Sequence, residues 1–204
     1  MIFSGISQAS EATVRRSFWR HFRNGKNRMI FGHYGRNVYL FPGVRIVRPK
    51  YISIGDDVTI GNDTDLYVHP LQRNSKEFII QIENNVHIGR NNIIGARKSV
   101  ILEENVLIGH HVIIGDHSHR YENVDVPVKM QEATEAGPIR IGRDSWIGAN
   151  VFVLPNVTIG RHAVIGANAV VNRDIPAFSV AVGAPARVIK RYDFDLKQWV
   201  KVNE

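Results

Sequence analysis

Aliphatic residues return at every sixth position over long stretches of this chain. An α-helix needs apolar spacings of three and four residues, and a half-buried strand alternates strictly, so neither explains this period. The pattern predicts a β-solenoid in which each unit supplies one short strand and one turn, with the aliphatic side chain inward and glycine easing the tight corner. Glycine follows four of the six aliphatic residues in the C-terminal series, which is Ile141, Ile147, Val153, Ile159, Ile165 and Val171.

The same six-residue frame covers most of the chain and is broken twice, over residues 69–82 and 116–138. The regular faces of a solenoid are scaffold, so we expect the chemistry where the repeat is interrupted. We divide the chain into an N-terminal segment (1–34), a solenoid domain (35–191) with a candidate active-site loop (116–138), and a C-terminal tail or short helix (192–204). Fifteen units are recognisable, the earlier ones beginning at Ile54, Ile60, Leu66, Ile88, Ile94 and Val100 and, after a two-residue shift of the frame, at Leu102, Ile108 and Ile114.

The second interruption begins with two histidines, His117 and His119, directly after the regular unit Ile114-Gly115. A neutral imidazole can remove a hydroxyl proton at pH 7. His117 is the stronger candidate because it lies at the end of the rigid coil, and a base must be held in place. His69 opens the first interruption and is a weaker candidate for substrate contact. The remaining histidines are interpreted as structural or surface residues: His21, His33, His87, His110, His111 and His162.

The composition is that of a soluble globular domain, with 204 residues, 44% hydrophobic and 22% charged. The absence of cysteine excludes disulfides, zinc fingers and a thiol nucleophile. A metal site at His117 and His119 would need further ligands that the nearby sequence supplies only as loop carboxylates, so no metal is expected. No apolar run approaches the roughly 18 residues of a membrane span, and the start of the chain lacks a signal-peptide pattern. We therefore expect a cytoplasmic protein.

The net charge of +7 is unevenly distributed. Residues 1–50 hold ten Lys and Arg against Glu11 alone, whereas the rest of the chain carries 16 basic and 18 acidic residues. Because a nucleic-acid protein spreads basic residues over its reading surface, no nucleic-acid partner is expected. Residues 10–24 are predicted to form a basic amphipathic helix. Two interpretations remain open for it: a cap on the solenoid, or peripheral contact with the anionic inner face of a membrane.

Three sequence features resemble the hexapeptide-repeat acyltransferases: the units of an aliphatic residue followed by Gly, the stretch WIGAN (146–150), and the ending VGAPARVIK (182–190). The closest similarity is to the galactoside, maltose and polysaccharide O-acetyltransferases, and it covers about residues 35 to 191. The resemblance implies an all-β, left-handed parallel β-helix with three hexapeptides per coil. It also implies a homotrimer and acetyl-CoA as the acyl donor.

The resemblance also assigns roles to individual residues. The family's catalytic histidine corresponds to His117, and His119 becomes a substrate contact, with the reverse assignment as the alternative. Trp146 corresponds to a tryptophan at the acceptor end of the site, although a core role is equally consistent with its sequence position. Two small residues correspond to family positions along the pantetheine arm of CoA: Ala149 and Ala167. Four polar residues correspond to family positions near the CoA nucleotide: Asn172, Arg173, Arg187 and Lys190.

Taken with the resemblance, the sequence predicts an acetyl-CoA-dependent O-acetyltransferase acting on a sugar hydroxyl, in a surface polysaccharide or its lipid-linked precursor. One alternative is an N-acetyltransferase acting on a nucleotide-linked amino sugar or an antibiotic. A second alternative, from another class, is a non-catalytic β-helix scaffold, because a fold alone does not determine a function.

Overall fold

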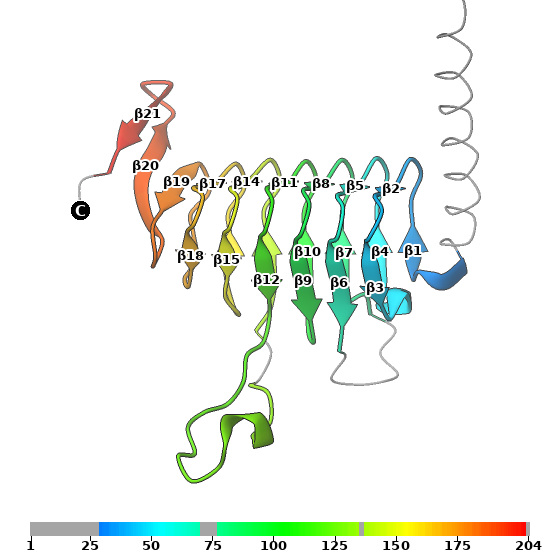
Figure 1. Ribbon diagram of the computed structural model, residues 1–204. Helices are drawn as coiled ribbons and strands as arrows, with labels where there is room; N and C mark the ends of the chain where they lie inside the picture. Colours follow the sequence, from blue (N-terminus) through cyan, green and yellow to red (C-terminus); the bar gives the residue numbers. More distant parts are fainter. Residues whose placement is uncertain (1–28, 70–76, 135–136, 203–204) are drawn as a thin grey trace, which may run out of the picture.

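The computed structural model describes residues 29–69, 77–134 and 137–202 and shows a stack of coils wound around one axis (Figure 1). Each regular coil contributes one strand to each of three parallel sheets, here called faces A, B and C. Face A contains β1 (His33–Tyr34), β4 (Ile52–Ile54), β7 (Ile80–Ile82), β10 (Val100–Leu102), β13 (Ile139–Ile141) and β16 (Thr158–Ile159).

Face B begins with β2 (Tyr39–Leu40), β5 (Thr59–Ile60), β8 (His87–Ile88), β11 (Leu107–Ile108), β14 (Trp146–Ile147) and β17 (Val164–Ile165). It ends with β19 (Ser179–Val182), β20 (Arg187–Asp193) and β21 (Gln198–Lys201). Face C contains β3 (Arg45–Val47), β6 (Asp65–Val68), β9 (Ile93–Ala96), β12 (Ile113–Gly115), β15 (Phe152–Val153) and β18 (Val170–Val171). Two short 3₁₀ helices, η1 (Pro49–Tyr51) and η2 (Val128–Met130), lie between strands.

The aliphatic residues of the six-residue frame stack on one another inside the coils, as predicted. On face B, Ile88 pairs with Ile108, which pairs in turn with Ile147. These side chains are almost completely inaccessible to solvent, so each coil buries its aliphatic residues against those of its neighbours. This repeated burial of apolar surface provides the stabilising free energy of the solenoid.

The corners use a different residue from the one expected. Asn and Asp take the left-handed backbone conformation there, as at Asn105 and Asp144, which short polar side chains tolerate. The Asn105 amide group also donates to Asp144 Oδ1 in the next coil at 2.9 Å. Glycine is needed for close packing instead, since a Cβ placed on Gly142 would lie 2.5 Å from the backbone nitrogen of Arg161.

The C-terminal tail forms a β-hairpin and not the helix considered above. Strand β20 pairs antiparallel with β19, and β21 pairs antiparallel with β20. Tyr192 and Trp199 face each other across the hairpin, with ring centroids 5.5 Å apart in an edge-to-face arrangement. The pairing holds residues 187–193 and 198–201 in the extended conformation of strands, so they do not form a helix. The predicted helix over residues 10–24 lies outside the described residues.

Both interruptions follow strands of face C. The first follows β6, the second follows β12, and β9 lies between these two strands. The arms of the second loop pair with each other: Thr134 N donates to Ser118 O at 2.9 Å, and Arg120 N donates to Glu132 O at 3.2 Å. The loop projects from the edge of face C in Figure 1. No helix in the described ranges is long and apolar enough to cross a membrane.

Candidate active site

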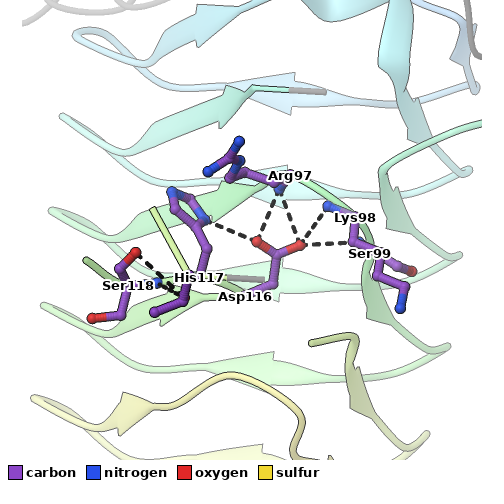
Figure 2. Close-up of polar contacts among 7 residues, drawn as sticks. Arg97, Lys98, Ser99, Asp116, His117 and Ser118 are labelled. Atoms are coloured by element: carbon purple, nitrogen blue, oxygen red, sulfur yellow. Dashed lines mark hydrogen bonds and ion pairs between the residues drawn. The ribbon is translucent and has the colours of Figure 1, made fainter. Parts of the chain in front are cut away.

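A buried carboxylate, that of Asp116, anchors the site at the end of β12. Its side chain is fully buried and faces the turn that follows β9. Arg97 N donates to Oδ1 at 2.9 Å, while Lys98 N at 2.7 Å and Ser99 N at 3.0 Å donate to Oδ2 (Figure 2). Hydrogen bonds to an ionised acceptor are stronger than neutral ones, so three backbone donors compensate this buried charge and hold it in place.

The next residue, His117, is oriented by this carboxylate. Nδ1 of His117 lies 2.9 Å from Oδ1 of Asp116, and the imidazole remains 19% exposed (Figure 2). An ionised carboxylate can only accept a hydrogen bond, so Nδ1 carries a proton. In the neutral ring Nε2 therefore has the free lone pair. This is the tautomer that a general base requires.

Two further polar residues stand in the same row as His117. Strands β6, β9 and β12 are in register, with Tyr67 opposite Gly95 and Gly95 opposite Gly115. Extending that register by two residues places His69, Arg97 and His117 side by side at the edge of face C. The hydrogen bond from His69 N to Ala96 O, at 2.8 Å, continues the pairing in this direction. The structure thus places His69, the weaker candidate, in the same row as His117.

Arg97 was not among the residues singled out from the sequence. Its guanidinium group lies beside the His117 ring in Figure 2, and its backbone nitrogen holds Asp116. A signal for it was present in the six-residue frame, because His69, Arg97 and His117 each follow an aliphatic residue (Leu66, Ile94 and Ile114) by three positions. Residues at equal frame positions in successive coils become neighbours.

The imidazole of His69 is held by a second arginine. Nη1 of Arg48 lies 3.0 Å from Nδ1 of His69 and donates to Val68 O at 2.8 Å. Burial lowers the pKa of His69, and the positive charges of Arg48, His117 and Arg97 lower it further. Because arginine can only donate, Nδ1 of His69 accepts and the ring proton of its neutral form is on Nε2.

Two glycines shape the outward surface beside His117. A Cβ placed on Gly95 would lie 2.2 Å from the ring of Tyr67, so that phenol lies directly over Gly95. Among the described residues, a Cβ placed on Gly115 would have one neighbour within 4 Å, the carbonyl oxygen of His117 at 3.9 Å. The outward side of Gly115 is therefore open. Burial raises the pKa of Tyr67, and the nearby charges of Asp116 and Asp65 raise it further.

His119 has a different environment from His117. It is exposed, and its backbone forms an antiparallel bridge with Ala133 between the two arms of the loop. Among the described residues no hydrogen bond to its ring is found. The structure therefore places both histidines at the mouth of the loop and orients only His117 through a partner. The described part of the chain contains no group of three or more His, Asp or Glu side chains arranged to hold a metal ion.

Within one chain, the residues expected to contact the acceptor and acetyl-CoA lie away from His117. Trp146 is on face B, 51% exposed, between Leu107 and Val164 of the neighbouring coils. Ala149 and Ala167 stack in successive coils at the corner between faces B and C, where Asn168 N donates to Ala149 O at 2.9 Å. The polar residues are Asn172 and Arg173 after β18, and Arg187 and Lys190 on β20.

The repeat itself matches a known family. Residues 138–173 match the model described as bacterial transferase hexapeptide (six repeats). These residues therefore carry the hexapeptide repeat of that transferase family. The fold of the chain is accordingly the left-handed parallel β-helix that the resemblance implied. The matched region contains Trp146, Ala149 and Ala167 and begins at the end of the loop that follows His117.

Two acetyltransferases resemble larger parts of the chain. A probable acetyltransferase of Mycobacterium tuberculosis is 37% identical over 156 residues, which are 75% of this chain and 49% of that protein. WbbJ of Escherichia coli K12, assigned to lipopolysaccharide biosynthesis as an O-acetyl transferase, is 35% identical over 60% of this chain and 62% of its own length. This chain thus spans about half the length of the Mycobacterium relative.

Two solved structures share the fold. A hexapeptide-repeat acetyltransferase of Vibrio cholerae, complexed with acetyl-CoA, has a TM-score of 0.58 and 26% identity, over 84% of this chain and 77% of that chain. The N-acyltransferase AntD of Bacillus cereus, in complex with a dTDP-linked amino sugar and coenzyme A, has a TM-score of 0.71 and 20% identity, over 85% of this chain and 91% of that chain. At that identity, the likeness to AntD concerns the fold alone.

Proposed function

We propose that this chain is an acetyl-CoA-dependent O-acetyltransferase acting on a sugar hydroxyl, in a surface polysaccharide or its lipid-linked precursor. The observation that carries the proposal is the hydrogen bond between Nδ1 of His117 and the buried carboxylate of Asp116. It leaves Nε2 free to accept a proton at the edge of the solenoid. A β-helix that served only as a scaffold would have no need for an oriented, partly exposed imidazole with a buried counter-charge.

In the proposed reaction, Nε2 of His117 takes the proton of the acceptor hydroxyl while the hydroxyl oxygen attacks the thioester carbonyl. The tetrahedral intermediate then expels the CoA sulfur, which receives that proton from the imidazolium, giving an acetyl ester and CoA thiol. The carboxylate of Asp116 stabilises the imidazolium between the two steps and prevents the ring from turning. General-base catalysis of this kind contributes about a hundredfold to ten-thousandfold in rate.

Acetyl-CoA is proposed as the donor on the chemistry of the C-terminal coils. Ala149 and Ala167 offer small side chains on successive corners, along which an extended pantetheine arm can lie close to the backbone. Arg173, Arg187 and Lys190 have no carboxylate partner among the described side chains, and such cations suit the phosphates of the nucleotide. The Vibrio cholerae relative, which was crystallised with acetyl-CoA, supports the same donor.

A homotrimer is proposed because, within one chain, the residues of the proposed site lie on two different faces of the solenoid. His117 is at the edge of face C, whereas Trp146 is on face B and Ala149 is at the corner between faces B and C. A neighbouring copy that brings its own face B against this edge would supply Trp146 as the wall for the acetyl group or the sugar. In that arrangement His119, on the loop, contacts the acceptor.

The acceptor class rests on the similarity to the Escherichia coli O-acetyl transferase. The Bacillus cereus neighbour acylates through an N-acyltransferase reaction, but at 20% identity it supports the fold and not the acceptor. A hydroxyl also depends more on a base than an amine does, because an amine can attack before its proton leaves. The oriented imidazole therefore favours the hydroxyl acceptor.

The test is an acceptor screen with the purified protein. Acetyl-CoA is incubated with a panel of neutral sugars, amino sugars, uronic acids, sugar phosphates and polysaccharide fragments, and CoA release is measured together with the mass of the product. We expect an ester on a sugar, and loss of its formation in His117→Ala. The matched control is His33→Ala, an exposed histidine in the first described coil, which should keep full activity.

Transfer only to amino groups would replace the O-acetyl proposal with N-acylation at the same base. Absence of transfer to the whole panel, together with failure of acetyl-CoA to bind, would favour the scaffold interpretation.

A further inference from the structure

Two arginines beside the row of His69, Arg97 and His117 lack a carboxylate partner in the described part of the chain. On the same face, Arg45 is paired with Asp65, and Asp116 is occupied by His117 and three backbone nitrogens. Arg48 and Arg97 have no such partner in these ranges. The edge of face C therefore carries unbalanced positive charge next to the proposed base.

Arg97 presents an unused donor. Its Nε is buried and has no hydrogen-bond partner among the described atoms. A buried atom cannot reach an incoming ligand, so the two Nη groups are the donors that Arg97 can offer to one. Nη1 and Nη2 of a guanidinium form a fork that matches two oxygens of a phosphate or a carboxylate. In Figure 2 this guanidinium lies beside the imidazole of His117.

Arg48 is held in place by the protein itself. It adopts a left-handed backbone conformation (φ 59°, ψ 58°) before η1, at the kind of position that Asn and Asp occupy elsewhere in the solenoid. Nη1 is bound to Val68 O and to Nδ1 of His69, while none of its other N–H groups has a described acceptor. Because these bonds orient the side chain, a ligand would not have to order it.

His69 adds a neutral donor between the two arginines. Its Nδ1 accepts from Arg48, so its Nε2 carries the proton and can donate to a ligand. Burial and the nearby cations lower its pKa, which disfavours a third positive charge in the row. The row His69, Arg97 and His117 thus combines hydrogen-bond donors for an anion with one free lone pair, on Nε2 of His117.

We propose that the acceptor carries an anionic group, a phosphate or a carboxylate, which binds Arg97, Arg48 and Nε2–H of His69 and thereby directs the hydroxyl to His117. This inference rests on the proposed acyl transfer at His117. It names a class of acceptor: a sugar attached to a phosphate, as in a nucleotide-linked or lipid-linked precursor, or a sugar with its own carboxylate. A neutral glycoside would leave both guanidinium groups without a counter-charge.

The experiment compares three acceptors built on each sugar of a hexose panel: the neutral methyl glycoside, the sugar 1-phosphate and the methyl glycoside of the uronic acid. The wild-type protein should show a kcat/KM about tenfold to a hundredfold higher for one anionic form than for the neutral form, the range expected for a charge-assisted contact. The phosphate and uronate arms distinguish the two sources of the anion. Arg97→Gln and Arg48→Gln should each remove most of that preference.

Arg45→Gln is the matched control, because it removes an arginine of the same face that already has a carboxylate partner. It should leave the preference unchanged. Arg97→Gln keeps the backbone nitrogen that binds Asp116, so its melting temperature should match the wild type. Equal use of neutral and anionic acceptors, or an equal loss of all activities in Arg97→Gln, would overturn the proposal.

A binding measurement separates this inference from the acyl transfer itself. Calorimetry with sugar 1-phosphates and uronates, without acetyl-CoA, is carried out on a background with Arg187→Ala and Lys190→Ala, which removes cations of the proposed donor site. Binding that is lost in Arg97→Gln supports the anion site even if no transfer is found. Transfer to neutral sugars without any anion binding would retain the proposed function and reject the anion site.

Discussion

Nδ1 of His117 lies 2.9 Å from Oδ1 of Asp116, and this carboxylate is held in turn by three backbone nitrogens of the preceding coil. The backbone of the solenoid therefore sets the position of the proposed base through the carboxylate of Asp116. A carboxylate that accepts from fixed donors cannot turn away from the imidazole. Catalysis needs groups held to within about half an ångström, and this arrangement meets that need.

Replacement of His117 should separate catalysis from binding. His117→Ala should lower kcat by about a hundredfold to ten-thousandfold, the usual contribution of a general base, and leave acetyl-CoA affinity and the melting temperature unchanged. His119→Ala should act mainly on the acceptor KM, because its ring has no partner that orients it. Steady-state kinetics with calorimetry of donor binding measures both effects. If His119→Ala loses the larger share of kcat, the roles of the two histidines exchange.

Asp116→Asn should impair both activity and stability. The side-chain amide can turn its NH₂ group toward His117, so that Nδ1 accepts and Nε2 becomes protonated, which is the wrong tautomer for a base. The expected loss in kcat is on the order of a thousandfold or more.

The buried NH₂ group in Asp116→Asn also faces backbone donors, so the free energy of unfolding should fall by about 1–3 kcal/mol in urea titrations. Full activity at normal stability would show that the carboxylate does not orient the base. A double variant with His117→Ala should lose no more kcat than His117→Ala alone.

Gly115 provides a steric test of where the substrates lie. A Cβ there meets no atom closer than 3.9 Å, so Gly115→Val should fold normally, with a change in stability within about 0.5 kcal/mol. Its methyl groups would extend into the open space beside His117, and kcat/KM should fall at least about tenfold, by more than in Gly115→Ala. Gly95→Ala is the contrasting variant, because its Cβ would collide with the Tyr67 ring and lower the melting temperature. An active Gly115→Val would place the substrates elsewhere.

The stability of the protein should depend on pH through His69. Its pKa in the folded protein is below the ordinary value of 6.5, so the unfolded chain binds more protons between the lowered pKa and 6.5. The free energy of unfolding therefore rises with pH through that window, and the contribution is lost as the pH falls through it. Urea midpoints at pH 7.5 and pH 5 should differ less in His69→Gln than in the wild type. His87→Gln, an exposed histidine on β8, should keep the wild-type difference, and equal differences in all three proteins would contradict the prediction.

The trimer should depend on apolar residues that one chain leaves exposed. Leu107 and Trp146 pair across face B, Ile113 and Phe152 pair across face C, and all four are at least 40% exposed. Sedimentation at micromolar concentration should give a mass three times that of the 23.1 kDa chain. Phe152→Glu should give a folded monomer without activity, since its outward side chain has no part in the buried core.

Thr158→Glu, an exposed strand residue on face A, should leave the trimer intact. A wild-type monomer would reject both the trimer and the site shared between subunits.

The repeat in the sequence was sufficient to predict a β-solenoid, because one six-residue pattern recurs along the chain, while the left hand of its coils came from the resemblance to the family. Each hexapeptide contacts only the unit one coil away, so the period that places Ile88, Ile108 and Ile147 inward can be read without any long-range information. The same period marked the loop after Ile114 as an interruption and made His117 the candidate base. The C-terminal residues carry no such repeat, and their antiparallel pairing with β19 was therefore not predicted.

Only the tertiary structure decided which side chains meet at the site. Asp116 lies beside His117 in sequence, but its role depends on backbone donors of the coil before it, which are 17 to 19 positions earlier in the chain. Arg48 belongs to yet another coil, and its contact with His69 depends on the turn before η1. Stacking of coils joins residues 17 to 21 positions apart at this site, so the charge and the hydrogen-bond partners of the site are properties of the stack.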